Sequence, residues 1–115
     1  MGTVVLTDAK YRSSIAAART LGRAGYQVAA VQAGRWDFPD PPVFSSRYVA
    51  RGHRIAAAPE EPEYGDRLLE LLGEYGHPVL FCVGAATLQM VSRRREEFSK
   101  ICDFLVAPPE VLDQL

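Results

Sequence analysis

The chain has 115 residues, of which 48% are hydrophobic and 23% are charged, and its formal net charge is −1. This size and composition fit one soluble globular domain, residues 1–115. The near-neutral charge argues against nucleic acid or an anionic membrane as a partner, because both require a cationic excess. With only two cysteines, no signal-peptide pattern and no apolar run of about 20 residues, we expect a cytoplasmic protein.

The first third of the chain predicts a β-α-β unit. Residues 3–7 form an uncharged, β-branched run that is typical of a strand buried on both faces. A helix is expected to follow the polar turn and to end near Ala24, because Gly25 stands where a helix C′ residue would. The run Val-Ala-Ala-Val at residues 28–31 predicts a second buried strand, parallel to the first.

The middle of the chain has weaker periodicity. Residues 34–44 contain three prolines and predict an irregular loop, and residues 45–49 predict a short edge strand. Leucines between residues 68 and 72 predict an amphipathic helix that stops before Gly76 and Pro78.

The last third predicts strand, helix and strand in turn. Residues 79–83 form a strongly apolar run, and residues 84–87 turn it into a helix. The expected apolar face of this helix consists of Leu88, Val91, Phe98 and Ile101. Residues 104–106 predict a final strand, and residues 110–115 the start of another helix.

Strands that alternate with helices indicate an α/β domain of the three-layer α/β/α, Rossmann-like type, with a mainly parallel sheet. We expect the strand order 3-2-1-4-5. The chain then reverses direction between the first strand and the strand at residues 79–83. Ligands of open α/β sheets bind at this switch point, outside the carboxyl ends of the strands. The turns at residues 7–10 and 83–87 would flank that crevice.

The first turn supplies polar candidates for binding. Asp8 would orient a substrate or cap the following helix, and Ser13 and Ser14 would offer donors to an anion at the helix N-terminus. Lys10 and Arg12 add positive charge that favours a carboxylate or phosphate. Plain helix capping and solvated side chains are the competing interpretations. The turn lacks the glycine pattern of dinucleotide and P-loop sites, which argues against both.

The second turn supplies Gly84, Ala85 and Thr87. A residue without Cβ at position 84 would let backbone approach a ligand, although tight turn geometry explains it equally well. Cys82 is expected to be a buried structural thiol and not a nucleophile, because it lies inside an apolar run with no histidine nearby. No catalytic residue and no metal ligand is predicted in this chain.

Four stretches resemble, in order and spacing, the N-terminal preATP-grasp domain of ATP-grasp ligases, nearest the group of the carbamoyl-phosphate synthetase large chain. They read TDAKYRSSIAAARTLGRAGYQV, SSRYVAR, LFCVGAATLQMVSRRREEF and FLVAPPEVLDQL. The resemblance covers nearly the whole chain. It implies a domain on the acceptor-substrate side of a carboxylate-amine ligase, whose ATP and Mg²⁺ are held by later domains of the same or a neighbouring chain.

The resemblance also implies that this chain alone is inactive and that it is a piece of a longer or split protein. Its substrate would be a small carboxylate or amine. We expect apolar side chains such as Trp36, Phe38, Val111 and Leu112 to cover an adjacent domain, and the isolated chain to self-associate, for example as a homodimer. The alternative function is a stand-alone flavodoxin-like module that binds a small anion or a protein.

Overall fold

The computed structural model describes residues 2–9, 12–34 and 41–104. The five strands are β1 (Thr3–Leu6), β2 (Gln27–Ala33), β3 (Val49–Ile55), β4 (Val79–Phe81) and β5 (Asp103–Phe104). The helices are α1 (Arg12–Arg23), η1 (Pro42–Ser45), α2 (Pro62–Glu74), α3 (Ala85–Arg93) and α4 (Arg95–Ser99). Of the predicted strand at residues 104–106, Phe104 belongs to β5, and residues 105–106 lie outside the described residues. The predicted helix at 110–115 lies outside the described residues, as do Trp36, Phe38, Val111 and Leu112.

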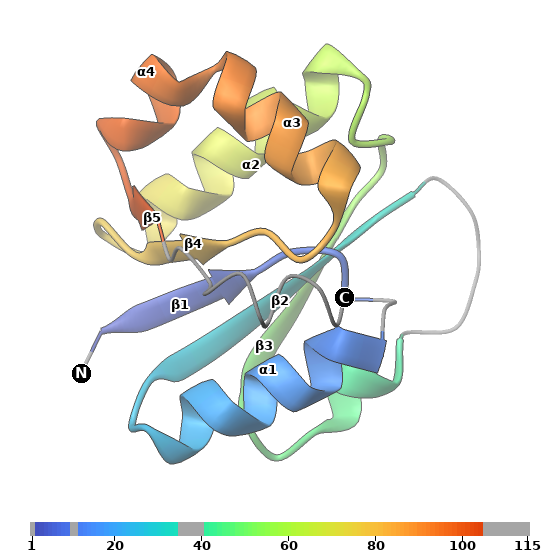
Figure 1. The fold of residues 1–115 in the computed structure, drawn as a ribbon, viewed down its shortest axis with the longest axis vertical. Helices are drawn as coiled ribbons and strands as arrows, with labels where there is room; N and C mark the ends of the chain where they lie inside the picture. The colour runs from blue at the N-terminus through green and yellow to red at the C-terminus, as the bar shows by residue number, and fades with distance from the viewer. Residues whose placement is uncertain (1, 10–11, 35–40, 105–115) are drawn as a thin grey trace.

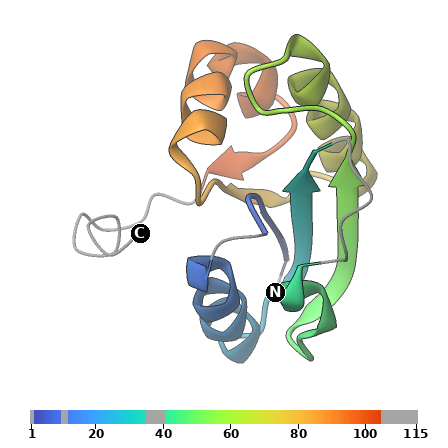
Figure 2. The same ribbon diagram turned by 90° about the vertical axis from the view of Figure 1, so that its right-hand side faces the viewer.

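All strand pairs are parallel, and the strand order is β3-β2-β1-β4-β5. The predicted order and the α/β class are thus confirmed. Helix α1 and the short η1 lie on one face of the sheet, and α2, α3 and α4 lie on the other, which gives three layers (Figure 1). A view turned by 90° shows the sheet between the two helical layers (Figure 2). None of the described helices is long and apolar enough to cross a membrane.

Each face of the sheet has its own apolar core, because alternate strand residues point to opposite faces. On the α2 and α3 face, Val5, Val31 and Leu80 pack with side chains of those helices, and on the α1 face, Val4 and Ala30 pack with that helix. Central strands covered on both faces need apolar residues at every position. This explains why β1 and β2 were recognisable as uninterrupted apolar runs.

Two predicted boundaries are wrong. The edge strand occupies Val49–Ile55, so it shares only Val49 with the predicted range 45–49; Ser45 ends η1, and a turn follows it up to Tyr48. Most β3 side chains are exposed, so an edge position removes the apolar signal that marks the central strands. Gly25 does follow α1 with φ 99°, as a helix C′ glycine should.

The predicted long helix after β4 is also interrupted. Arg94 has φ −110° and ψ 27°, which ends α3 and starts α4 at the same residue. Leu88, assigned to the buried face, is 48% exposed, whereas Val91 and Phe98 are buried as expected.

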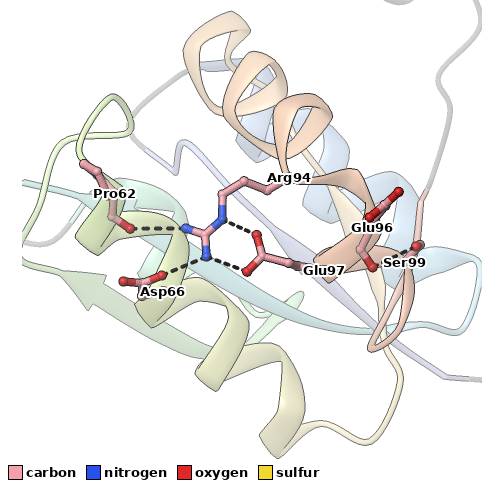
Figure 3. A network of polar contacts seen from close by, with 6 residues as sticks. All are labelled: Pro62, Asp66, Arg94, Glu96, Glu97 and Ser99. Atoms are coloured by element: carbon pink, nitrogen blue, oxygen red, sulfur yellow. Dashed lines mark hydrogen bonds and ion pairs between the residues drawn. The ribbon is translucent and has the colours of Figure 1, made fainter.

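The Arg94 side chain joins this break to α2. Its guanidinium donates to Asp66 at 2.8 Å and to the two Glu97 carboxylate oxygens at 2.7 and 3.0 Å, and also to the Pro62 carbonyl at 3.3 Å. Figure 3 shows the guanidinium between the first turn of α2 and the α4 carboxylate. Gly65 makes room for it, since a Cβ there would lie 2.3 Å from Arg94 Nη1. Two carboxylates therefore neutralise this one arginine.

Candidate functional site

The carboxyl ends of the three central strands are tied together by the turn after β1. The Thr7 N–H donates to the Phe81 carbonyl, and the Ala9 N–H to the Val31 carbonyl, both at 3.0 Å. Asp8 lies between them with φ 59°, in the left-handed region that aspartate tolerates better than most residues. The turn thus places the Asp8 side chain between β1 and β4, at the predicted switch point.

Asp8 is 7% exposed, and its carboxylate accepts three hydrogen bonds. Its Oδ2 accepts from the Thr7 hydroxyl at 2.5 Å and from the Gly84 N–H at 2.8 Å, and its Oδ1 accepts from the Thr87 hydroxyl at 2.9 Å. Gly84 immediately precedes α3, so the negative charge lies at the positive end of that helix. The Asp8 carboxylate therefore occupies the α3 N-terminus in the way that a bound anion would.

This geometry corrects the interpretation of Gly84 as open space for a ligand. An added Cβ at that position would lie 2.7 Å from both Cγ and Oδ1 of Asp8. Gly84 has an ordinary extended backbone, with φ −90° and ψ 146°, so turn conformation does not require glycine either. The absence of a side chain at position 84 leaves room for the Asp8 carboxylate.

The serines of the first turn of α1 differ in their roles. Ser14 is fully buried, and its hydroxyl donates to the Asp8 backbone carbonyl at 2.7 Å. It fixes the turn and has no exposed oxygen to offer to a ligand. Ser13 is half-buried. We call the cluster of Thr7, Asp8, Ser14, Gly84 and Thr87 the Asp8 site.

The remaining predicted residues are less fully placed. Ala85 begins α3 and is exposed beside the site. Lys10 lies outside the described residues, and Arg12 is described only as the first residue of α1. The structure thus brings together Asp8, Ser14, Gly84 and Thr87 from the two predicted turns.

Sequence reasoning missed a second layer behind the Asp8 site. Tyr64 of α2 is fully buried, and burial together with the Asp8 charge raises the pKa of its phenol. The Thr87 hydroxyl acts in the opposite direction on that pKa, but it is committed to Asp8, and no well-formed hydrogen bond reaches the Tyr64 oxygen from the described residues. Nothing in the local sequence around Tyr64 indicates that its side chain lies behind the Asp8 site.

Cys82 completes this layer and is not an activated nucleophile. Burial, followed by the nearby Asp8 charge, raises the pKa of its thiol to about 12. A thiol with so high a pKa stays protonated at neutral pH, whereas reactive cysteines carry lowered pKa values. Cys82 is half-buried and not fully buried as predicted, but its raised pKa agrees with the predicted structural role.

The Asp8 site can act as a rigid hydrogen-bond acceptor. Both threonine protons are directed at the carboxylate, so the hydroxyl oxygens present only lone pairs to their surroundings. Within the described part of the chain, no cationic side chain pairs with Asp8, and no group of three or more His, Cys, Asp or Glu residues is arranged for a metal ion. Neither the family models nor the curated proteins that were compared with the sequence give a match.

Proposed function

We propose that this chain is the substrate-side, N-terminal domain of an ATP-grasp carboxylate-amine ligase and is catalytically incomplete alone. The observation that carries the proposal is the hydrogen bond between the Gly84 N–H and Asp8, which joins residues 76 positions apart. These residues belong to two separate stretches of the resemblance. Their meeting at the switch point of a 3-2-1-4-5 sheet supports the resemblance, because short motifs that match by chance need not converge.

The described residues around the Asp8 site do not fit ATP. The first turn lacks a glycine-rich loop, and the start of α3, the kind of helix end that binds phosphate, already holds a carboxylate that would repel a phosphate group. ATP and Mg²⁺ are therefore assigned to later ATP-grasp domains. The role left to this chain is to form one wall of the acceptor site and to position the acceptor.

The charge of the Asp8 site bears on which acceptor group meets it. A substrate carboxylate placed there would face the Asp8 carboxylate in a poorly solvated turn, and like charges in such a setting repel strongly. An amine or amide N–H would instead meet an acceptor in the small exposed part of Asp8, because the Thr7 and Thr87 hydroxyls are fully buried. We therefore assign the amine part of the substrate to this crevice, in place of the anion that the first turn alone predicted.

The experiment joins this chain to an ATP-grasp domain encoded in frame or by the neighbouring gene. ADP release with Mg-ATP and pooled amines and carboxylates should require both parts. Asp8→Asn should lower turnover about tenfold or more, because the charge that orients the amine is lost. Arg19→Ala, a change at an exposed residue of α1 outside the Asp8 site, is the control.

Two results would overturn the proposal. One is an ATP-grasp partner that turns over equally well without this chain, and the other is unchanged turnover of a folded Asp8→Asn variant. A genome with no ATP-grasp segment nearby would favour the stand-alone binding module. Calorimetry on the 115-residue chain should show no micromolar binding of Mg-ATP.

A further inference from the structure

A second polar cluster lies at the opposite, amino end of the sheet. It consists of Arg23, the last residue of α1, and of Arg47 and Tyr48, which form the turn before β3. Strands β2 and β3 both start here, with Val28 paired to Val49. We call these three residues the Tyr48 site. It shares no residue with the Asp8 site, and its argument does not depend on the proposed ligase function.

The fold holds Tyr48 in place. Its ring lies against the backbone of Gly22, where an added Cβ would come within 2.7 Å of Tyr48 Cδ1. Its backbone N–H donates to the Ser46 hydroxyl at 3.2 Å. The ring is thus fixed from the α1 side and from its own turn, so the phenol oxygen has a defined position.

Two guanidinium groups converge on that oxygen. Arg47 Nη2 donates to the Tyr48 hydroxyl at 2.8 Å and Arg23 Nε at 3.3 Å. Their Cζ atoms lie 4.9 and 5.9 Å from the ring centroid, within the range of cation–π attraction. The bond from Arg47, followed by that from Arg23, lowers the pKa of the Tyr48 phenol.

The cluster presents donors only. A phenol oxygen that accepts two N–H bonds has its own O–H proton left, and each guanidinium keeps further N–H groups beyond the one bound to Tyr48. Within the described part of the chain, neither Arg23 nor Arg47 forms an ion pair with a carboxylate. Arg94 and Arg67, by contrast, do.

We propose that Arg23, Arg47 and the Tyr48 hydroxyl form a binding site for the phosphate group of a small phosphate monoester. Two positive charges match the dianion, and the planar forks suit its oxygens. A carboxylate would carry one charge against two. Anionic polymers are disfavoured because the protein as a whole has a net charge of −1.

The experiment is an NMR titration of the full chain with glycerol 3-phosphate and, separately, inorganic phosphate, acetate and glycerol. The Arg23 and Arg47 Nε–H signals and the backbone signals of residues 22–23 and 46–48 should shift saturably with the two phosphates. Acetate should bind about tenfold more weakly, and glycerol should cause no shift. The Tyr48 pKa should rise on binding, because the phosphate dianion disfavours ionisation of the phenol.

Variants locate the site. Arg23→Ala and Arg47→Ala should each weaken glycerol 3-phosphate binding about tenfold, and Tyr48→Phe, which keeps the ring on Gly22, about threefold. Arg47→Lys should recover only part of the loss, since lysine lacks the fork. Arg19→Ala, one helical turn before Arg23, is the matched control and should change affinity less than about twofold.

The proposal is overturned if neither phosphate causes a saturable shift at these residues, or if acetate binds as well as glycerol 3-phosphate. It also fails if Arg19→Ala weakens binding as much as Arg23→Ala, which would indicate a diffuse positive field. Binding to vesicles that contain phosphatidic acid, without binding to glycerol 3-phosphate, would replace the small-molecule ligand with a membrane.

Discussion

The Asp8 site and the Tyr48 site show opposite solutions to placing charge in one small domain. At the Asp8 site, one carboxylate is almost fully buried and three donors converge on it. At the Tyr48 site, two exposed cations converge on one neutral phenol and keep unused donors. The difference follows from burial, because an unpaired group inside the protein loses its hydration whereas an exposed one keeps it.

Burial also determines which site can change without unfolding the chain. Removing Asp8 from its site leaves buried donors with no acceptor, so these residues contribute to the stability of the fold. Removing an arginine from the Tyr48 site leaves nothing buried and unpaired. The Tyr48 site therefore contributes little to the fold, yet its residues are held in a defined geometry. This makes it a candidate for binding, although it lies at the amino end of the sheet.

The largest effect is expected for Asp8→Ala. The substitution leaves the Gly84 N–H and two threonine hydroxyls without their acceptor and puts alanine at φ 59°. The free energy of unfolding should fall by about 3 to 4 kcal/mol, measured by urea denaturation. Asp8→Asn should cost less, since asparagine tolerates this φ and keeps one acceptor oxygen. Equal stability of the alanine variant would mean that the carboxylate is not needed for the fold.

Gly84→Ala tests the same contact from the other side. The new Cβ would collide with the Asp8 carboxyl carbon, and the free energy of unfolding should fall by about 2 kcal/mol. In an Asp8→Gly background the obstacle is gone, so the added cost of Gly84→Ala should nearly vanish. A double-mutant cycle with no coupling would show that the alanine is accommodated elsewhere. Any residue bulkier than glycine at position 84 should therefore destabilise the fold.

Alkaline pH should weaken the buried site. The pKa of Cys82 is about 12 in the folded chain against 9.0 in the unfolded one, so above pH 9 the unfolded chain binds fewer protons than the folded chain. Stability then falls as pH rises, and this one group accounts for roughly 2 kcal/mol by about pH 10.5. The Cys82→Ala variant, compared with the native chain in urea titrations between pH 8 and 10.5, should show a flatter decline. Parallel declines would assign the loss to other groups, such as Tyr64.

Arg94 tests how much an arginine with two carboxylate partners contributes to stability. Arg94 binds Asp66 and Glu97 and is less exposed than an ordinary surface arginine, with 23% of its side chain accessible. Arg94→Ala should lower the free energy of unfolding by about 1 to 1.5 kcal/mol. Arg67→Ala is the matched control, since its pair with Glu63 is a single exposed contact within one helix and should contribute a few tenths. Equal effects of the two changes would mean that the Arg94 network adds nothing beyond one pair.

The features that were predicted correctly are those that a local sequence pattern encodes. Apolar runs located the central strands, and chain order with the switch-point rule predicted that the turns of Asp8 and Gly84 lie at the same edge of the sheet. The sequence did not predict that the two residues bond to each other, because that contact spans 76 positions and leaves no mark in either turn. The first turn was therefore interpreted as waiting for an external anion, whereas the anion of α3 comes from the chain itself.

The other misses have the same origin. Strand β3 is an exposed edge, so its sequence lacks an apolar period. The break at Arg94 depends on bonds to α2, about 30 positions earlier, and Tyr64 reaches the Asp8 site from that same helix. Arg23 and Tyr48 lie 25 positions apart, and only the packing of the turn before β3 against Gly22 brings them together.

The smallest effect is expected for the pair Arg23→Ala and Arg47→Ala. Each change removes one exposed hydrogen bond to Tyr48 and one cation–π contact, while it also relieves the repulsion between two like charges. These contributions oppose each other, so the double variant should have a free energy of unfolding within about 0.5 kcal/mol of the native chain. Urea denaturation at low salt, where exposed charges act most strongly, is the measurement.

Salt gives the double variant a second, sharper readout. Raising ionic strength screens the repulsion between Arg23 and Arg47, so the native chain should gain slightly in stability relative to the double variant. The Arg94→Ala comparison should move the other way, because salt there weakens attraction to Asp66 and Glu97. A double variant that loses as much stability as Arg94→Ala would show that the Tyr48 site is a structural clamp. The two arginines would then be accounted for by the fold, and the contrast with the buried Asp8 site would no longer point to a ligand.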